Sequence, residues 1–434
     1  MREAIKHQTA LPRVQRDLKT LQSRWKGEKT NKALRLTDEE LLQLVPSRQI
    51  VDHYVRLYFD TSETMYRILH QPNFWKEYQL FWEDQQAASP AFVAILLLIM
   101  ATVSCISTKE EPKFIGDSAM ARERAVLWIE VSERWHRQHS QKNIYLAIWQ
   151  IRCLLLLAKQ INIVKKKKTW TAAGSLVREA MSAGFHRDPS LLGEKVSVFD
   201  QEMRRRLWAT MTELELQVSI DRGMPSATAG VPSDSATVLN INDDELGVEP
   251  GSPPIPKPSS EHTACSFLHI SRASFSLRVT LNSLVNDLSS PSRYEEVLNY
   301  EEQVTKEIQK LPRRAGPGKT HNNGELPNLT RGVLLDVQLR QFLILLHAPF
   351  ARKADANSRY SLSRMICLNA AASIIEQYSQ LQSSEKFLLL LLRHDYFRAA
   401  LNICHTMYIS ISIRSVFRTK TLPITPNNTD ASHR

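Results

Sequence analysis

The apolar residues of this chain recur mostly at intervals of three and four, the spacing that places them on one face of an α-helix. No run of alternating positions typical of strands occurs, and no internal repeat of fixed period is present. The pattern predicts one large all-α domain of about a dozen antiparallel helices over about residues 36–420. The clearest predicted helices span residues 118–139, 144–161, 169–183, 200–220, 262–288, 293–311, 329–348, 360–380 and 386–416.

Several of these helices carry recognisable end signals. Thr37 and Glu40 have the spacing of a capping box, so a helix is expected to begin there. Gly184 can take the left-handed conformation after the helix at 169–183, and Pro189 prevents that helix from resuming. The next helix is expected to begin near Asp200 and to carry one apolar stripe. The stripe comprises Met203, Leu207, Met211, Leu214 and Val218.

Charge and composition divide the chain into unequal parts. Residues 1–35 hold ten Lys/Arg and three Asp/Glu, so +7 of the net charge of +11 lies in this basic arm, which is expected to be mobile. Residues 223–256 contain no Lys or Arg, five acidic residues and many Gly, Pro and Ser, and they are too long for a simple connection. The predicted divisions are a basic linker at 1–35, two helical halves at 36–222 and 262–420, an acidic, Pro-rich crossing segment at 223–261 and a flexible tail at 421–434.

The basic arm contains a short apolar seam with intervals of 3, 4, 3 and 4, the a/d pattern of about two heptads. One interpretation is a short dimerisation coil. The other is an amphipathic helix that lies on the main domain, since two heptads alone are marginally stable. The seam residues are Leu11, Val14, Leu18, Leu21 and Trp25.

An uncharged run of sixteen residues, Ala91 to Ile106, resembles a membrane segment but is shorter than the about 20 residues that a spanning helix needs. We therefore expect a helix buried inside the core and no membrane partner. The N-terminus shows no apolar region of a secretory signal.

The sequence offers no catalytic or metal-binding pattern. It lacks the glycine-rich phosphate loops, H-E-x-x-H and G-x-S-x-G. His136 and His139 lie three residues apart, but they have no carboxylate or cysteine partner in sequence, and we interpret them as surface histidines. The five cysteines show no metal-ligand spacing. Cys105, Cys153, Cys367 and Cys404 lie in apolar helical runs and are expected to be small buried hydrophobic residues, whereas Cys265 lies in a more polar stretch.

Two basic runs invite a nucleic-acid interpretation. Arg204, Arg205 and Arg206 fall inside a predicted helix, where three consecutive residues span about 200° of the circumference, so at least one flanks the apolar stripe. We expect a buried link from an arginine to a carboxylate rather than a phosphate contact. The run of Lys165, Lys166, Lys167 and Lys168 lies between two helices, and it fits a nuclear-import signal, a phosphate contact or a solvated loop equally well.

Three motifs between Trp170 and Pro225 occur together: W-T-A-A-G-S-L-V-R-E-A-M-S-A-G-F-H-R-D-P, then E-M-R-R-R-L-W, then R-G-M-P-S. The combination closely resembles the signature of the fungal-specific transcription factor regulatory domain, the all-helical middle region of zinc-cluster transcription factors. Similar stretches at 58–74, 240–246 and 345–350 extend the likeness to about residues 45–420. The matching positions are Trp170, Gly174, Arg178, Gly184, His186, Arg187, Asp188, Glu202, Arg204, Arg205, Arg206, Trp208, Gly223 and Pro225.

The resemblance implies a nuclear protein that is not an enzyme and that regulates RNA polymerase II transcription through an effector-sensing domain. The partners it implies are the transcription machinery and DNA, the latter contacted through another module or a partner. A second copy of the chain, in a homodimer, and a small-molecule effector are further candidates. Family members usually begin with a zinc cluster held by six cysteines, whereas the first cysteine here is Cys105. Zinc is therefore expected only if that module is missing from this sequence. The alternative is a dimerising partner or inhibitor that does not bind DNA.

The seam makes a testable prediction about assembly. If it forms a parallel coil, the chain dimerises through its first 30 residues with about micromolar affinity, because two heptads bury little area. Leu18→Asp places a charge in the seam and is expected to shift the mass measured by light scattering toward that of the monomer. Equal masses for wild type and variant at every concentration would show that the stripe is only one side of a surface helix.

The distribution of basic residues predicts weak, nonspecific DNA binding by this chain. Only the basic arm and the lysine run offer phosphate contacts, and such contacts carry no sequence information. Gel-shift titrations over a salt series are expected to show a steep loss of affinity as salt rises. A tight, sequence-selective shift at physiological salt would refute this prediction.

Overall fold

The structure is a computed structural model. The residues that it describes are 16–17, 19–20, 37–107, 113–115, 118–138, 146–191, 196–247, 253–290, 292–311, 326–383 and 393–420, with backbone only at 326–331, 380–383, 393–394 and 409–420.

Helices make up almost all of the regular structure, as the periodicity predicts. A two-residue antiparallel hairpin, β1 (Phe114–Ile115) with β2 (Ser118–Ala119), is the exception among the described residues. The helices of the first half are α3 (Asp38–Leu42), α4 (Arg48–Asp60), α5 (Ser62–Met65), α6 (Gln71–Glu83), α7 (Pro90–Val103), η1 (Ser104–Ile106), α8 (Met120–Gln138), α9 (Leu146–Ile161), η2 (Lys166–Lys168), α10 (Thr169–Ser182) and α11 (Val198–Arg222). Those after the first half are η4 (Asp243–Glu245), α12 (Ser266–Val285), α13 (Tyr294–Lys310), α14 (Leu326–Ala351), η5 (Ser358–Tyr360), α15 (Ser361–Ser383) and α16 (Arg393–Lys420).

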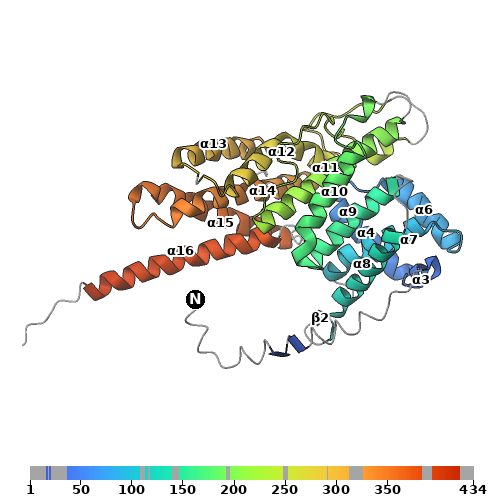
Figure 1. The fold of residues 1–434 in the computed structure, drawn as a ribbon, viewed down its shortest axis with the longest axis horizontal. Coiled ribbons are helices and arrows are strands. Elements are labelled where there is room, and N and C mark those ends of the chain that lie inside the picture. Colours follow the sequence, from blue (N-terminus) through green and yellow to red (C-terminus); the bar gives the residue numbers. More distant parts are fainter. Residues whose placement is uncertain are drawn as a thin grey trace, which may run out of the picture.

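Helix α11 lies between two groups of helices (Figure 1). Helices α3–α9 lie on one side of it, α12–α16 lie on the other, and α16 runs along an outer edge and extends beyond the body. A continuous cluster of buried apolar side chains runs from Leu41 in the first half to Ala399 in the second. Both halves therefore contribute to one core.

The predicted end signals are present in the structure. Thr37 and Glu40 form the capping box, with the Glu40 amide donating to Thr37 Oγ1 at 3.2 Å and the Thr37 amide donating to Glu40 Oε2 at 2.9 Å. Gly184 follows α10 with φ of 77°, the left-handed conformation that glycine adopts without steric cost.

Helix α7 confirms the buried-helix interpretation of the uncharged run. Residues 92–103 are all buried, so apolar side chains cover the whole circumference of this helix. Within the described residues, the stretch Gly332–Ala351 of α14 is also long and apolar enough to cross a membrane by length and composition. A buried core helix can have the same length and hydropathy as a membrane span, and 67% of this stretch is buried inside the fold.

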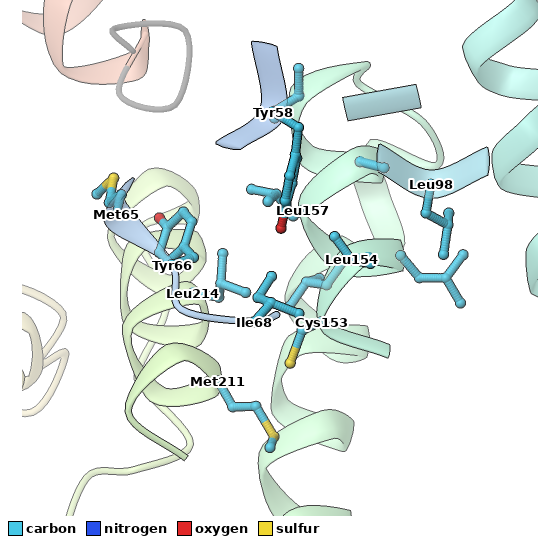
Figure 2. Close-up of a cluster of buried hydrophobic side chains, with 14 of the residues drawn as sticks. Tyr58, Met65, Tyr66, Ile68, Leu98, Cys153, Leu154, Leu157, Met211 and Leu214 are labelled. Carbon is cyan, nitrogen blue, oxygen red and sulfur yellow. The ribbon is translucent and has the colours of Figure 1, made fainter. Parts of the chain in front are cut away.

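The apolar stripe predicted for α11 is buried, but burial is not confined to that stripe. Every residue from 206 to 220 is buried, polar residues included. The reason is the position of α11: neighbours from both halves cover it on all sides. The core beside it brings together side chains from distant parts of the first half (Figure 2). Those labelled there are Tyr58, Met65, Tyr66, Ile68, Leu98, Cys153, Leu154, Leu157, Met211 and Leu214.

The expectation of buried cysteines holds for some positions and fails at two. Cys153, Cys265 and Cys367 are buried, whereas Cys105 and Cys404 are exposed. Cys105 lies in η1, just after the buried helix, and its thiol donates to Asn162 Oδ1 at 3.2 Å. Cys404 lies on a side of α16 that faces away from its neighbours, which an apolar sequence context cannot reveal.

Candidate functional site

The crossing segment does not span open space but returns along α11 in the opposite direction. Carboxylates and an indole of α11 bind the segment at three points. The segment and the helix run in opposite directions, so later residues of the segment contact earlier residues of α11. In order, the Ala227 amide donates to Glu215 Oε1 at 2.8 Å, Trp208 Nε1 donates to Ser233 Oγ at 3.2 Å, and the Leu239 amide donates to Glu202 Oε1 at 3.1 Å.

Asp243, in the short helix η4 of this segment, contacts both α6 and α11. One carboxylate oxygen accepts from Arg206 Nη1 of α11 at 2.7 Å. The other accepts from the Arg67 guanidinium and from the Gln71 amide at the first position of α6, the latter at 2.8 Å. His70 Nε2 donates to the Asp243 carbonyl at 2.8 Å. Asp243 thus joins α6, α11 and the crossing segment at one point.

The charges in this cluster balance inside the protein. Arg206 and Glu202 are fully buried and lie 3.3 Å apart, and Arg67 and Asp243 are at most 5% exposed. Burial alone raises the pKa of Asp243, but Arg67 and Arg206 hold that pKa well below its ordinary value. Burial raises the pKa of Glu202, with Arg206 opposing the shift.

The expected buried link from an arginine to a carboxylate is therefore observed at Arg206. Its partners are Glu202 in the preceding turn and Asp243 in the crossing segment. On a helix surface, an ion pair one turn apart stabilises the helix by only a few tenths of a kcal/mol. The pair at Arg206 is buried, and removing one partner of a buried pair leaves an unpaired charge at a cost of about 3–5 kcal/mol.

Glu63 borders the cluster and is also fully buried. Tyr58 Oη donates to one of its oxygens at 2.7 Å, and the Leu69 amide donates to the other at 2.8 Å. Burial raises the pKa of Glu63 to about 8, and the nearby Arg67 opposes that shift. The ion pair of Arg67 is with Asp243.

The turn at 184–188 fastens to the same segment. Asp188 accepts from Arg205 Nη2 at 2.9 Å and from the Ala236 amide at 2.7 Å, while Arg187 Nε donates to Asp234 at 2.9 Å. A surface hollow of about 310 Å³ lies beside this turn. Its lining residues are Ala183, Gly184, Arg187, Asp188, Leu191 and Arg204.

The remaining signature residues lie at the ends and sides of the same contact region. Trp170 Nε1 donates to the Pro225 carbonyl at 3.1 Å. Gly174 of α10 faces the segment, since a side-chain carbon there would lie 3.6 Å from Ala227 Cβ and 3.0 Å from the Arg178 guanidinium. Gly223 ends α11 in the left-handed conformation, with φ of 60°.

Arg204 binds the C-terminal end of α10. Its guanidinium donates to the Ala183 carbonyl at 2.9 Å and lies 4.3 Å from the centre of the Phe185 ring. His186 belongs to the same turn, and its carbonyl accepts from Ser233 Oγ at 2.8 Å. All three consecutive arginines are thus used inside the fold, where they bind carboxylates or a helix end.

Sequence reasoning missed Asp243 and Arg67 as members of this cluster. In the sequence, the stretch around Asp243 shows only its similarity to the family. A usable signal did exist: an arginine expected to be buried needs a carboxylate, and residues 223–256 of the crossing segment hold five acidic residues and no Lys or Arg. Nothing in the sequence indicated which of its acidic residues would serve.

The other candidates lie apart from the cluster. The four consecutive lysines are exposed; Lys165 pairs with Glu133 at 2.8 Å, while the next three form the short helix η2 before α10. His136 accepts from Arg152 Nε at 3.2 Å, and His139 lies outside the described residues. No group of three potential metal ligands occurs in the described part of the chain. The seam residues Leu11, Val14, Leu18, Leu21 and Trp25 also lie outside the described residues.

Comparison with known proteins adds the family. Residues 55–312 match the family model "Fungal specific transcription factor domain". The chain is 30% identical to Transcription factor opdR of Penicillium oxalicum over 77% of this chain and 42% of that protein, and 32% identical to Transcription factor lepE of Aspergillus flavus over 76% and 39%. It is 25% identical to the Zn(2)-C6 fungal-type transcription factor mpsB of Macrophomina phaseolina over 78% of this chain and 46% of that protein.

These relatives are considerably longer than this chain, which spans about two fifths of the length of the first two. No solved structure matches the chain. The match to the family model covers the whole buried cluster around Asp243, from Arg67 through Arg206 to η4.

The cluster predicts how stability depends on charge and pH. Asp243→Asn removes the charge that Arg67 and Arg206 share, and it is expected to lower the free energy of unfolding by about 3–5 kcal/mol in urea titrations. Because the folded-state pKa of Asp243 is depressed, its contribution is fully present above its unfolded value of about 3.9 and is lost as pH falls below that value. Wild type is therefore expected to lose more stability than the variant between about pH 5 and pH 2.

Asp244→Asn is the matched control, because Asp244 is next to Asp243 in the sequence but its carboxylate is exposed. It is expected to change stability by no more than about 0.5 kcal/mol. Equal effects of the two substitutions would contradict the role assigned to Asp243.

Proposed function

Because this chain belongs to the fungal specific transcription factor domain family, we propose that its helical body is the regulatory, effector-sensing domain of a zinc-cluster-type regulator of RNA polymerase II transcription. Regulation of transcription is what the family and the relatives have in common; they are transcription factors and not enzymes. Location in the nucleus, sensing of an effector and contact with DNA through a zinc-binding module belong to the proposal.

The single observation that carries the proposal is the internal use of the signature arginines. Arg206 is fully buried against Asp243, and Arg205 binds Asp188 with both side chains 12% exposed. A phosphate contact would require these groups to reach solvent. The helical body therefore supports a role in holding and transmitting a conformation, with DNA recognition left to a separate module or to a partner.

The crossing segment is the element through which we expect a signal to act. It is bound to the first half at Asp243 and to α11 at Ala227, Ser233 and Leu239, and it precedes α12 of the second half. A ligand or protein that binds better to one position of this segment would shift the population of conformations in which the two halves are arranged. The hollow beside Gly184 has cationic groups at its edge, Arg187 and Arg204, which suits a small anionic effector.

The alternative function is a partner or inhibitor of related factors that does not bind DNA itself. The genomic sequence upstream of Met1 discriminates between the two. An in-frame six-cysteine exon there supports the regulatory domain of a DNA-binding factor, and stop codons support the partner.

A reporter experiment tests the proposed function directly. The chain is fused to an unrelated DNA-binding module in a fungal cell, and reporter output is compared with that of the module alone. We expect output to change in either direction, and we expect Asp243→Asn to alter that effect while Asp244→Asn preserves it. Immunoblots must show equal protein levels, which separates a regulatory defect from loss of the protein. Output equal to that of the module alone would contradict the proposal.

A further inference from the structure

Helix α16 exposes an unusual amount of apolar surface. Phe397 is 64% exposed, Leu401 57%, Met407 58% and Tyr408 71%. Positions 397, 401, 404 and 408 follow intervals of four, three and four, so Phe397, Leu401, Tyr408 and the exposed Cys404 form one stripe on the helix. We call these residues, together with Met407, the α16 stripe.

The sequence of α16 differs from that of a solvated helix. From residue 399 to 413, fifteen consecutive residues include no Asp, Glu, Lys or Arg. The side of a helix that faces water normally carries charged residues, and contiguous exposed apolar patches usually mark interaction sites. The composition therefore indicates that protein covers this side of α16.

The position of α16 leaves room for such a cover. Its opposite side packs on α14 and α15, where Asp395 and Ala399 are fully buried. The helix runs along an outer edge of the second half and its C-terminal part extends beyond the body (Figure 1).

We propose that a second copy of this chain covers the α16 stripe and that the two α16 helices pack against each other about a two-fold axis. A full aromatic side chain buries about 150–250 Å², so four large side chains exposed by 57–71% present on the order of 500 Å² per copy. A symmetric pair then buries on the order of 1,000 Å², close to the about 1,200 Å² at which specific interfaces begin.

The stripe complements itself, which favours a second copy over a different protein. Two-fold symmetry requires one patch to fit its own image, and an uncharged patch does so without bringing like charges together. In an antiparallel pair centred between positions 401 and 404, Phe397 meets Tyr408 of the second copy and Leu401 meets Cys404. In this arrangement, as in a parallel one, the two Cys404 side chains lie within about one helical turn of each other along the axis.

The proposed dimer goes beyond the proposed function, and it is tested by measuring molecular mass rather than reporter output. The 434-residue chain is examined by light scattering over a concentration series. We expect the mass to rise from that of one 49.7 kDa chain toward that of two. Leu401→Asp is expected to keep the mass near that of the monomer at concentrations where wild type is dimeric.

Leu80→Asp is the matched control, since Leu80 of α6 is 56% exposed, almost the same as Leu401. Circular dichroism shows whether each variant keeps its helical content. A monomeric wild type at every concentration, or equal masses for wild type and a folded Leu401→Asp, would overturn the proposal. So would loss of the dimer through Leu18→Asp with no effect of Leu401→Asp.

Thiol crosslinking supplies a second readout that does not depend on a destabilising substitution. The chain has two exposed cysteines, Cys105 and Cys404. A short bis-maleimide is expected to yield a covalent dimer from wild type and from Cys105→Ser, but none from Cys404→Ser. A dimer that persists in Cys404→Ser and disappears in Cys105→Ser would place the interface elsewhere and overturn the proposal.

Discussion

Two guanidinium groups, those of Arg67 and Arg206, lie buried inside this helical protein, and a buried charge without a partner costs several kcal/mol. The Asp243 carboxylate binds both. To bring it there, the chain must leave the end of α11, turn at Gly223 and return along the helix to the N-terminal end of α6. The course of the crossing segment follows from this one requirement, and with it the position at which the second half begins.

This requirement explains the family signature in physical terms. Glu202, Arg205, Arg206 and Trp208 hold the segment or the turn beside it. Gly174 leaves room for the Arg178 guanidinium, and Gly184 and Gly223 make the turns that direct the chain. The signature describes how a long connection is bound to a central helix. Its Arg205 and Arg206 bind carboxylates inside the fold and are not available for contacts with the phosphates of DNA, and this is why the function rests on the family and on the behaviour of the helical body.

The parts of the fold that depend on local sequence were predictable. The capping box at Thr37, the left-handed Gly184 and the wholly apolar α7 all follow from residues a few positions apart. The contacts of Asp243 were not predictable, because Arg206 lies 37 residues away and Arg67 176 residues away. The burial of the other sides of α11 was not predictable for a related reason: an apolar stripe indicates one buried side of a helix, whereas this helix is surrounded. Exposure of Cys404 depends likewise on which neighbours α16 meets.

The coupling between Asp243 and Arg206 is the most direct test of the central claim that their contact fixes the crossing segment. A double-mutant cycle in urea, with Asp243→Asn, Arg206→Met and the double variant, measures it. The contact predicts a coupling energy of about 1–3 kcal/mol, because either single substitution leaves the other group buried without its partner. Effects that add to within about 0.5 kcal/mol would show that the two residues act independently and would contradict the account.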